Sequence, residues 1–146
     1  MSTVPTLNGQ VIGQAHHATR ALLETRLADS GTTFHQSLAL NATADRGGAA
    51  ERDALVARMT STLKIDAAAA LAVLAELTAA GLLAELPGDG GRLGLTDSGR
   101  ARQDGIRAAV GELTARLYGD LPAEDLAAAA RVLTVVTARA DAELAG

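Results

Sequence analysis

The stretch of sequence that decides the fold is DAAAALAVLAELTAAGLLAELPGDGGRLGL, which covers residues 66–95. Its first half predicts a helix, because its large apolar residues repeat at helical spacing. Asp66 can cap the N-terminus of this helix, which runs to about Ala80. Gly81 follows at the position after a helix end where glycine is favoured. We therefore expect a helix with a defined start and a defined stop.

After Gly81 the spacing of the apolar residues changes from that of a helix to that of short strands. Residues 82–86 and 92–95 are the two strand candidates, and the segment Pro87–Gly91 between them has the glycine content of a turn. A hairpin of two strands buries too little surface to be stable alone. We therefore expect a two-stranded hairpin that packs against helices.

The chain before Asp66 predicts another helix, over residues 51–63, with its apolar residues at helical spacing. A helix, a second helix and a hairpin in this order form a winged helix-turn-helix, in which the hairpin is the wing. The sequence therefore predicts this unit at the centre of the chain.

Further helices flank the central unit on both sides. They cover residues 9–28, 33–44, 97 to about 118, and 122–144. Thr32 or Thr33 caps the helix at 33–44, and Thr96 caps the helix that begins at 97. Pro122 is the first residue of the last helix. The apolar stripes of the terminal helices have no partner within the small central unit. A homodimer interface is the natural place to bury them.

The composition limits the class of protein. Of the 146 residues, 48% are hydrophobic, 1% are aromatic and none is cysteine, which suits a single domain without disulfides or thiolate metal sites. The first ten residues lack the segments of a signal peptide, and no apolar run is long enough to span a membrane. We therefore expect a cytoplasmic protein without membrane contact. The net charge of −4 counts against strong non-specific binding to nucleic acid.

Four short motifs occur in order along the chain. They are Gly31-x-Thr33-x-x-Gln36, Leu63-x-Ile65-Asp66 continued by Val73-Leu74-x-x-Leu77-x-x-x-Gly81-Leu82-Leu83, Leu95-Thr96-x-x-Gly99-Arg100, and Leu121-Pro122-x-Glu124-Asp125. Together they resemble the MarR family of bacterial regulators over about residues 9–144. The resemblance implies a mainly α fold: a winged helix-turn-helix with long N- and C-terminal dimerisation helices and a two-stranded wing.

The resemblance also implies a domain organisation and partners. Residues 1–146 would form one MarR-like domain, with dimerisation helices at about 9–29 and 97–144 and a winged helix-turn-helix lobe at about 33–96. The family binds double-stranded DNA as a homodimer, with the fourth helix in the major groove and the wing in the flanking minor groove. A small aromatic or phenolic ligand binds between the dimer region and the lobe. The implied function is a ligand-responsive, DNA-binding transcriptional regulator.

The expected DNA contacts come from the third and fourth helices and the wing: Arg58, Ser61, Lys64, Ala67, Ala68 and Arg92. After Asp66, family members carry polar side chains where this chain has alanines, which can touch a thymine methyl group but cannot donate to a base edge. In the wing, the family's Asp-x-Arg element is replaced by Asp89-Gly90-Gly91-Arg92. Two hypotheses stay open. The chain is a regulator that depends on DNA shape, or a MarR-fold protein that has lost operator recognition and works as a small-molecule binder or enzyme.

The candidate ligand-binding residues lie on the first and second helices: His16, Arg20, His35, Ser37 and Asn41. His16 shares a helix face with Ile12 and Leu23, so we expect it to face inward, where it could hydrogen-bond a phenol or carboxylate. In the alternative interpretation the histidines are ordinary surface groups and Arg20 pairs with Glu24 one turn away. His16 and its neighbour His17 point about 100° apart, which suits a shared metal ion poorly. We expect no metal site, no cofactor and no catalytic residue.

Overall fold

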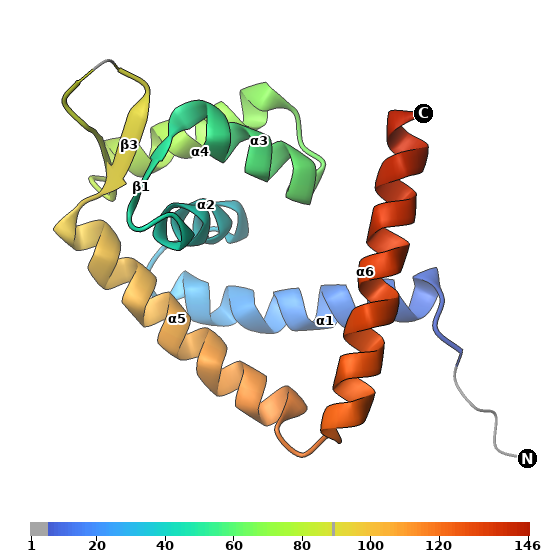
Figure 1. The fold of residues 1–146 in the computed structure, drawn as a ribbon. Helices are drawn as coiled ribbons and strands as arrows, with labels where there is room; N and C mark the ends of the chain where they lie inside the picture. The colour runs from blue at the N-terminus through green and yellow to red at the C-terminus, as the bar shows by residue number, and fades with distance from the viewer. Residues whose placement is uncertain (1–5, 89) are drawn as a thin grey trace, which may run out of the picture. The chain divides into compact units, whose positions relative to one another are not determined.

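The structure is a computed structural model that describes residues 6–88 and 90–146. Its elements are, in chain order, α1 (Gly9–Ala28), α2 (Phe34–Asp45), β1 (Ala49–Glu51), α3 (Arg52–Leu63), α4 (Ala67–Ala79), β2 (Leu83–Glu85), β3 (Arg92–Leu95), α5 (Asp97–Tyr118) and α6 (Ala123–Ala145) (Figure 1). The chain divides into two compact units, Met1–Gly111 and Glu112–Gly146.

Helix α2 lies at the centre of the first unit (Figure 1). It packs against α3, α4, β1 and β3, and α1 also contacts it. The most deeply buried large side chains come from α2, α3, α4 and the strands β2 and β3: Leu40, Leu55, Met59, Leu77, Leu83 and Leu93. The core is therefore aliphatic, as a sequence with one Phe and one Tyr requires.

The sheet of the wing has three strands, in the order β1–β3–β2. β2 and β3 form the predicted antiparallel hairpin, with Leu83 opposite Leu95. β1 pairs with the other edge of β3, where Ala49 lies opposite Gly94. The prediction of a two-stranded wing was therefore incomplete. β1 has only three residues and follows two glycines, so it shows no alternating pattern that would predict a strand.

The predicted helix starts of α4 and α2 are confirmed. The Asp66 carboxylate accepts a hydrogen bond from the Ala69 N–H at 2.8 Å. Thr33, rather than Thr32, caps α2. Its hydroxyl accepts from the Gln36 N–H, and the Gln36 side chain accepts from the Thr33 N–H, both at 3.1 Å. This reciprocal capping satisfies two backbone donors and fixes where α2 begins.

The second unit, Glu112–Gly146, holds the end of α5 and the whole of α6. No residue of α6 is buried. Large apolar side chains are exposed along it: Val132, Leu133, Val135, Val136 and Leu144. Among the described residues, no helix is both long and apolar enough to cross a membrane. α6 thus presents to water an apolar surface of the kind that proteins usually cover.

Candidate functional site

Helix α4, the expected groove-entering helix, exposes only apolar groups over its first turns. Ala67 and Ala68 are exposed, and Leu71 exposes 45% of its surface. The first polar side chain of α4 is Glu76, whose carboxylate accepts a hydrogen bond from Gln36 Nε2 at 3.1 Å. The face that would meet a partner therefore offers methyl groups and no side-chain hydrogen-bond donor.

Two of the expected phosphate contacts are held in ion pairs. Arg58 on α3 lies 3.5 Å from Asp45, and Arg92 on β3 lies 3.6 Å from Glu51. The side chains of both pairs are exposed, and pairs of this kind contribute little free energy in water. A phosphate can therefore compete for either arginine.

The turn between α3 and α4 carries the other two polar candidates, Ser61 and Lys64, and both are exposed. Lys64 closes α3 with a φ of 58°, in the left-handed region that favours glycine. Lys64 therefore lies in the turn between the two helices of the motif in a strained backbone conformation. Asp89, expected in the wing, lies outside the described residues.

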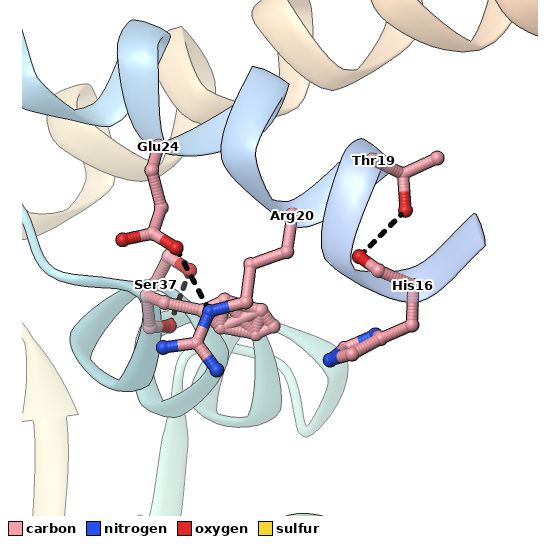
Figure 2. Close-up of polar contacts among 6 residues, drawn as sticks. His16, Thr19, Arg20, Glu24 and Ser37 are labelled. Atoms are coloured by element: carbon pink, nitrogen blue, oxygen red, sulfur yellow. Dashed lines mark hydrogen bonds and ion pairs between the residues drawn. The ribbon is translucent and has the colours of Figure 1, made fainter. Parts of the chain in front are cut away.

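Three of the predicted ligand-binding residues gather around Phe34. The guanidinium carbon of Arg20 lies 4.3 Å from the centre of the Phe34 ring, and the rings of His16 and His35 each approach it edge-on, with centroids 6.3 Å away. Arg20 also pairs with Glu24 at 2.8 Å, and Figure 2 shows this pair with His16 to one side of it. His16 is exposed, so the expectation that it faces inward was wrong, because α1 buries a single residue near its C-terminal end.

The other two predicted ligand-binding residues, Ser37 and Asn41, line a cleft of about 290 Å³ between α1, α2 and α5. Its remaining lining residues are Leu23, Leu38, Gln103, Ile106, Arg107 and Val110. Ser37 is buried, and its hydroxyl donates to the backbone carbonyl of Phe34 at 2.6 Å (Figure 2). Ligand sites usually begin at about 300 Å³, so this cleft suits a molecule with a single ring.

Gln103 is a residue of this cleft that sequence reasoning did not find. It is 4% exposed, and its Nε2 donates to Asn41 Oδ1 at 3.1 Å. A signal was present, because Gln103 lies three residues before Ile106 and so continues the apolar stripe of α5 with a polar side chain. Such a residue needs a polar partner inside the protein.

A wider hollow of about 570 Å³ lies between the C-terminal end of α1 and the first half of α5. Arg26 and Arg102 lie in its wall. Arg102 donates to the Thr32 hydroxyl at 2.9 Å. None of the predicted ligand-binding residues lines this hollow, so the smaller cleft is the candidate ligand site.

No protein-family model matches the sequence, and no curated protein matches it. Solved structures match it over nearly its whole length. The PcaV transcriptional regulator from Streptomyces coelicolor, in complex with its natural ligand, is 23% identical with a TM-score of 0.74, and the match covers 96% of this chain and 99% of that chain. CouR from Rhodococcus jostii RHA1, bound to p-coumaroyl-CoA, is 15% identical with a TM-score of 0.75, covering 88% of this chain and 90% of that chain.

A MarR variant from E. coli complexed with operator DNA is 22% identical to this chain, with a TM-score of 0.72. That match covers 88% of this chain and 91% of the other. At identities of this size, the similarity establishes the architecture. The predicted fold class is confirmed: this chain has the winged helix-turn-helix fold of the MarR-family transcriptional regulators.

Proposed function

We propose that this chain is a ligand-responsive, DNA-binding transcriptional regulator that acts in the cytoplasm as a homodimer. The main support for the proposal is that α3, α4 and the wing form a winged helix-turn-helix. In addition, the structure of the chain is similar to those of solved transcriptional regulators over nearly its whole length. One of these is a regulator complexed with operator DNA. In helix-turn-helix proteins the second helix of the motif enters the major groove, and α4 holds that position here.

The exposed apolar surface of α6 supports the homodimer. Val132, Leu133, Val135 and Val136 all lie on its surface. A two-fold interface pairs the same patch on both copies, so one exposed helix face is sufficient to build it. The aromatic content of 1% also leaves each chain with little area to bury, and a second copy adds to it.

Binding to DNA would rest mainly on phosphates. The side chains proposed for it are Arg58, Ser61, Lys64 and Arg92, with Ala67 and Ala68 inside the groove. Because the exposed start of α4 has no donor for a base edge, sequence preference would come largely from DNA shape. Affinity would fall steeply with salt, because each neutralised phosphate releases counterions.

The ligand would bind in the cleft at Ser37 and Asn41. Its leucine, isoleucine and valine side chains suit an aromatic ring, and its few polar groups suit a phenolic substituent. Two of the similar regulators were solved with a bound small molecule. Roles for His16, Arg20 and His35 in ligand binding stay a prediction, because these residues stand around Phe34 beside the cleft.

Fluorescence anisotropy of the full chain tests the proposal. The titration uses the DNA upstream of its own coding sequence and random DNA of equal length, at about 50 and 200 mM salt. We expect tighter binding to the upstream DNA, and a preference that persists at the higher salt. Failure to bind any DNA at the lower salt contradicts the proposal.

A second candidate function is a small-molecule binder or enzyme that has kept the fold and lost operator recognition. The observation that favours it is the exposed start of α4, which offers no hydrogen-bond donor, together with the ion pairs of Arg58 and Arg92. The same titration separates the two candidates. Ligand binding in the cleft without any preference among DNA sequences would favour this second function.

A further inference from the structure

A buried amide with an unused oxygen stands in the wall of the cleft. Gln103 Nε2 donates to Asn41 Oδ1, but Gln103 Oε1 is buried and accepts no hydrogen bond from the described residues. If the Gln103 amide were turned by 180°, its nitrogen would occupy the position of the unpaired oxygen and would itself lack a partner. Buried polar groups almost always have a partner, so this oxygen requires a donor from elsewhere.

A chain of polar contacts leads from Gln103 across α2 to α3. Asn41 Nδ2 donates to Asp45 Oδ2 at 3.5 Å, and the same oxygen lies 3.5 Å from Arg58 Nη2. Asn41 and Arg58 also line one small hollow of about 40 Å³. Arg58 is among the proposed phosphate contacts. The polar chain therefore connects the cleft with the surface that would face DNA.

The rest of the cleft limits what can supply the missing donor. Its walls are formed mainly by leucines, Ile106 and Val110, so the body of the occupant must be apolar. Arg107 is exposed at its edge and can meet an anionic substituent. The occupant that fits is a molecule of one ring with a neutral O–H or N–H donor, and with room for a carboxylate at Arg107.

We propose that Gln103 selects the ligand of this cleft by accepting a hydrogen bond from it at Oε1. Asn41 and Asp45 then transmit the effect of ligand binding to Arg58. The inference rests on the proposed function, because it uses Arg58 as a DNA contact. The carboxamide is planar, so a donor that draws Oε1 into the cleft also moves Nε2, and Asn41 follows. Asp45 then loses one of its two donors and holds Arg58 more strongly, which lowers the affinity for DNA.

The first test measures ligand selection by isothermal titration calorimetry of the full chain. The probes are 4-hydroxybenzoate, 4-methoxybenzoate and benzoate, of which only the first carries a hydroxyl donor. We expect the hydroxyl acid to bind at least about tenfold more tightly, because a site built for a hydrogen bond rejects analogues that lack it. Gln103→Leu should remove the preference, and Gln14→Leu, on the exposed surface of α1, should keep it.

The second test measures how the affinity for DNA depends on the Asp45–Arg58 ion pair. It uses a labelled random-sequence duplex at low salt. Asp45→Asn should tighten DNA binding about two- to fivefold, because Arg58 is released from an exposed ion pair. Asp53→Asn removes an equal charge from α3 and is the matched control. Adding Arg58→Gln to the Asp45 variant should cancel its gain. 4-Hydroxybenzoate should weaken DNA binding by the wild type and leave the Asp45 variant unaffected.

The outcomes separate the inference from the proposed function. Failure of all three acids to bind, equal binding of the three, or an unchanged preference in Gln103→Leu overturns ligand selection by Gln103. Equal gains from Asp45→Asn and Asp53→Asn overturn the connection to Arg58. A wild type that binds no DNA overturns that connection and the proposed function together, while the calorimetry still decides the role of Gln103.

Discussion

At the scale of single residues, Gly99 at the start of α5 has the least room for a side chain among the glycines of the described residues. A Cβ atom there would overlap the backbone carbonyl oxygen of Leu82, which is fixed by a hydrogen bond from the Thr96 N–H at 3.1 Å. We expect Gly99→Ala to lower the free energy of unfolding by about 2–3 kcal/mol, because the backbone must shift to accommodate the methyl group. Urea-induced unfolding at a fixed protein concentration measures the change.

Gly105, in the middle of the same helix, is the matched control. A Cβ atom there meets nothing within 4 Å. Gly105→Ala should raise the free energy of unfolding by about 0.5–1 kcal/mol, because alanine loses less backbone entropy in a helix. A loss of stability as large as that of Gly99→Ala would mean that contact with Leu82 does not decide the effect.

The role of a polar residue could be predicted from the sequence where its partner is close along the chain. The Arg20–Glu24 pair follows from their spacing of four residues on one helix. His16 and Gln103 could not be placed in this way. His16 shares a face with Ile12 and Leu23, which are half-buried, but its own side chain stays exposed, and the partner of Gln103 is Asn41, 62 residues away. Their surroundings depend on packing between helices, which spacing does not report.

Among the elements, α2 depends on its capping box, because it lies at the centre of the first unit. Thr33→Ala should lower the free energy of unfolding by about 1 kcal/mol, since the Gln36 N–H loses its acceptor. Thr25→Ala is the control, because the Thr25 hydroxyl only donates to the Leu22 carbonyl within α1. Thermal unfolding compares the two variants. An equal loss in both would contradict a special role for the cap.

Helix α4 leads to a prediction about bases. If it enters the major groove, Ala67, Ala68 and Leu71 can recognise only the methyl group of thymine. Replacing thymine by deoxyuridine at a contacted position of a bound duplex should weaken binding about fourfold for each methyl group, from the apolar contact that is lost. Anisotropy titrations with singly substituted duplexes, selected from a random library, measure the effect position by position.

The internal control is deoxyuridine at thymines outside the footprint of the helix, which should leave the affinity unchanged. Leu71→Ala should reduce the deoxyuridine effect at one position, because a large part of the exposed apolar contact is removed. If the chain selects a sequence but no thymine methyl group matters, its specificity comes from DNA shape alone.

Helices and the hairpin could be predicted from the sequence because each carries its own periodicity and its own stop signals. The methyl-bearing face of α4 could be predicted for the same reason, since burial of Val73, Leu74 and Leu77 fixes which side is exposed. β1 could not, because its three residues become a strand only by pairing with β3, about 45 residues later. The cleft could be expected only from the family resemblance, which pointed to Ser37 and Asn41, because three helices are needed to form it.

For the whole molecule, the main expectation is that α6 joins two copies. Its predicted apolar stripe includes Leu133 and Val136, and both side chains are exposed in the single chain. Val136→Glu would bury a charge without a partner in such an interface, so we expect a monomer at concentrations where the wild type is a dimer. Sedimentation velocity measures the oligomeric state.

Thr134→Glu is the matched control, because residue 134 lies roughly 100–160° around the helix from Val132, Leu133, Val135 and Val136. It adds the same charge to an exposed position of α6 and should leave the dimer intact. The monomeric variant should also bind DNA at least about tenfold more weakly, because the second lobe no longer binds at high effective concentration. A Val136→Glu chain that stays dimeric would place the interface elsewhere. A monomer with undiminished DNA affinity would show that one lobe is sufficient for binding.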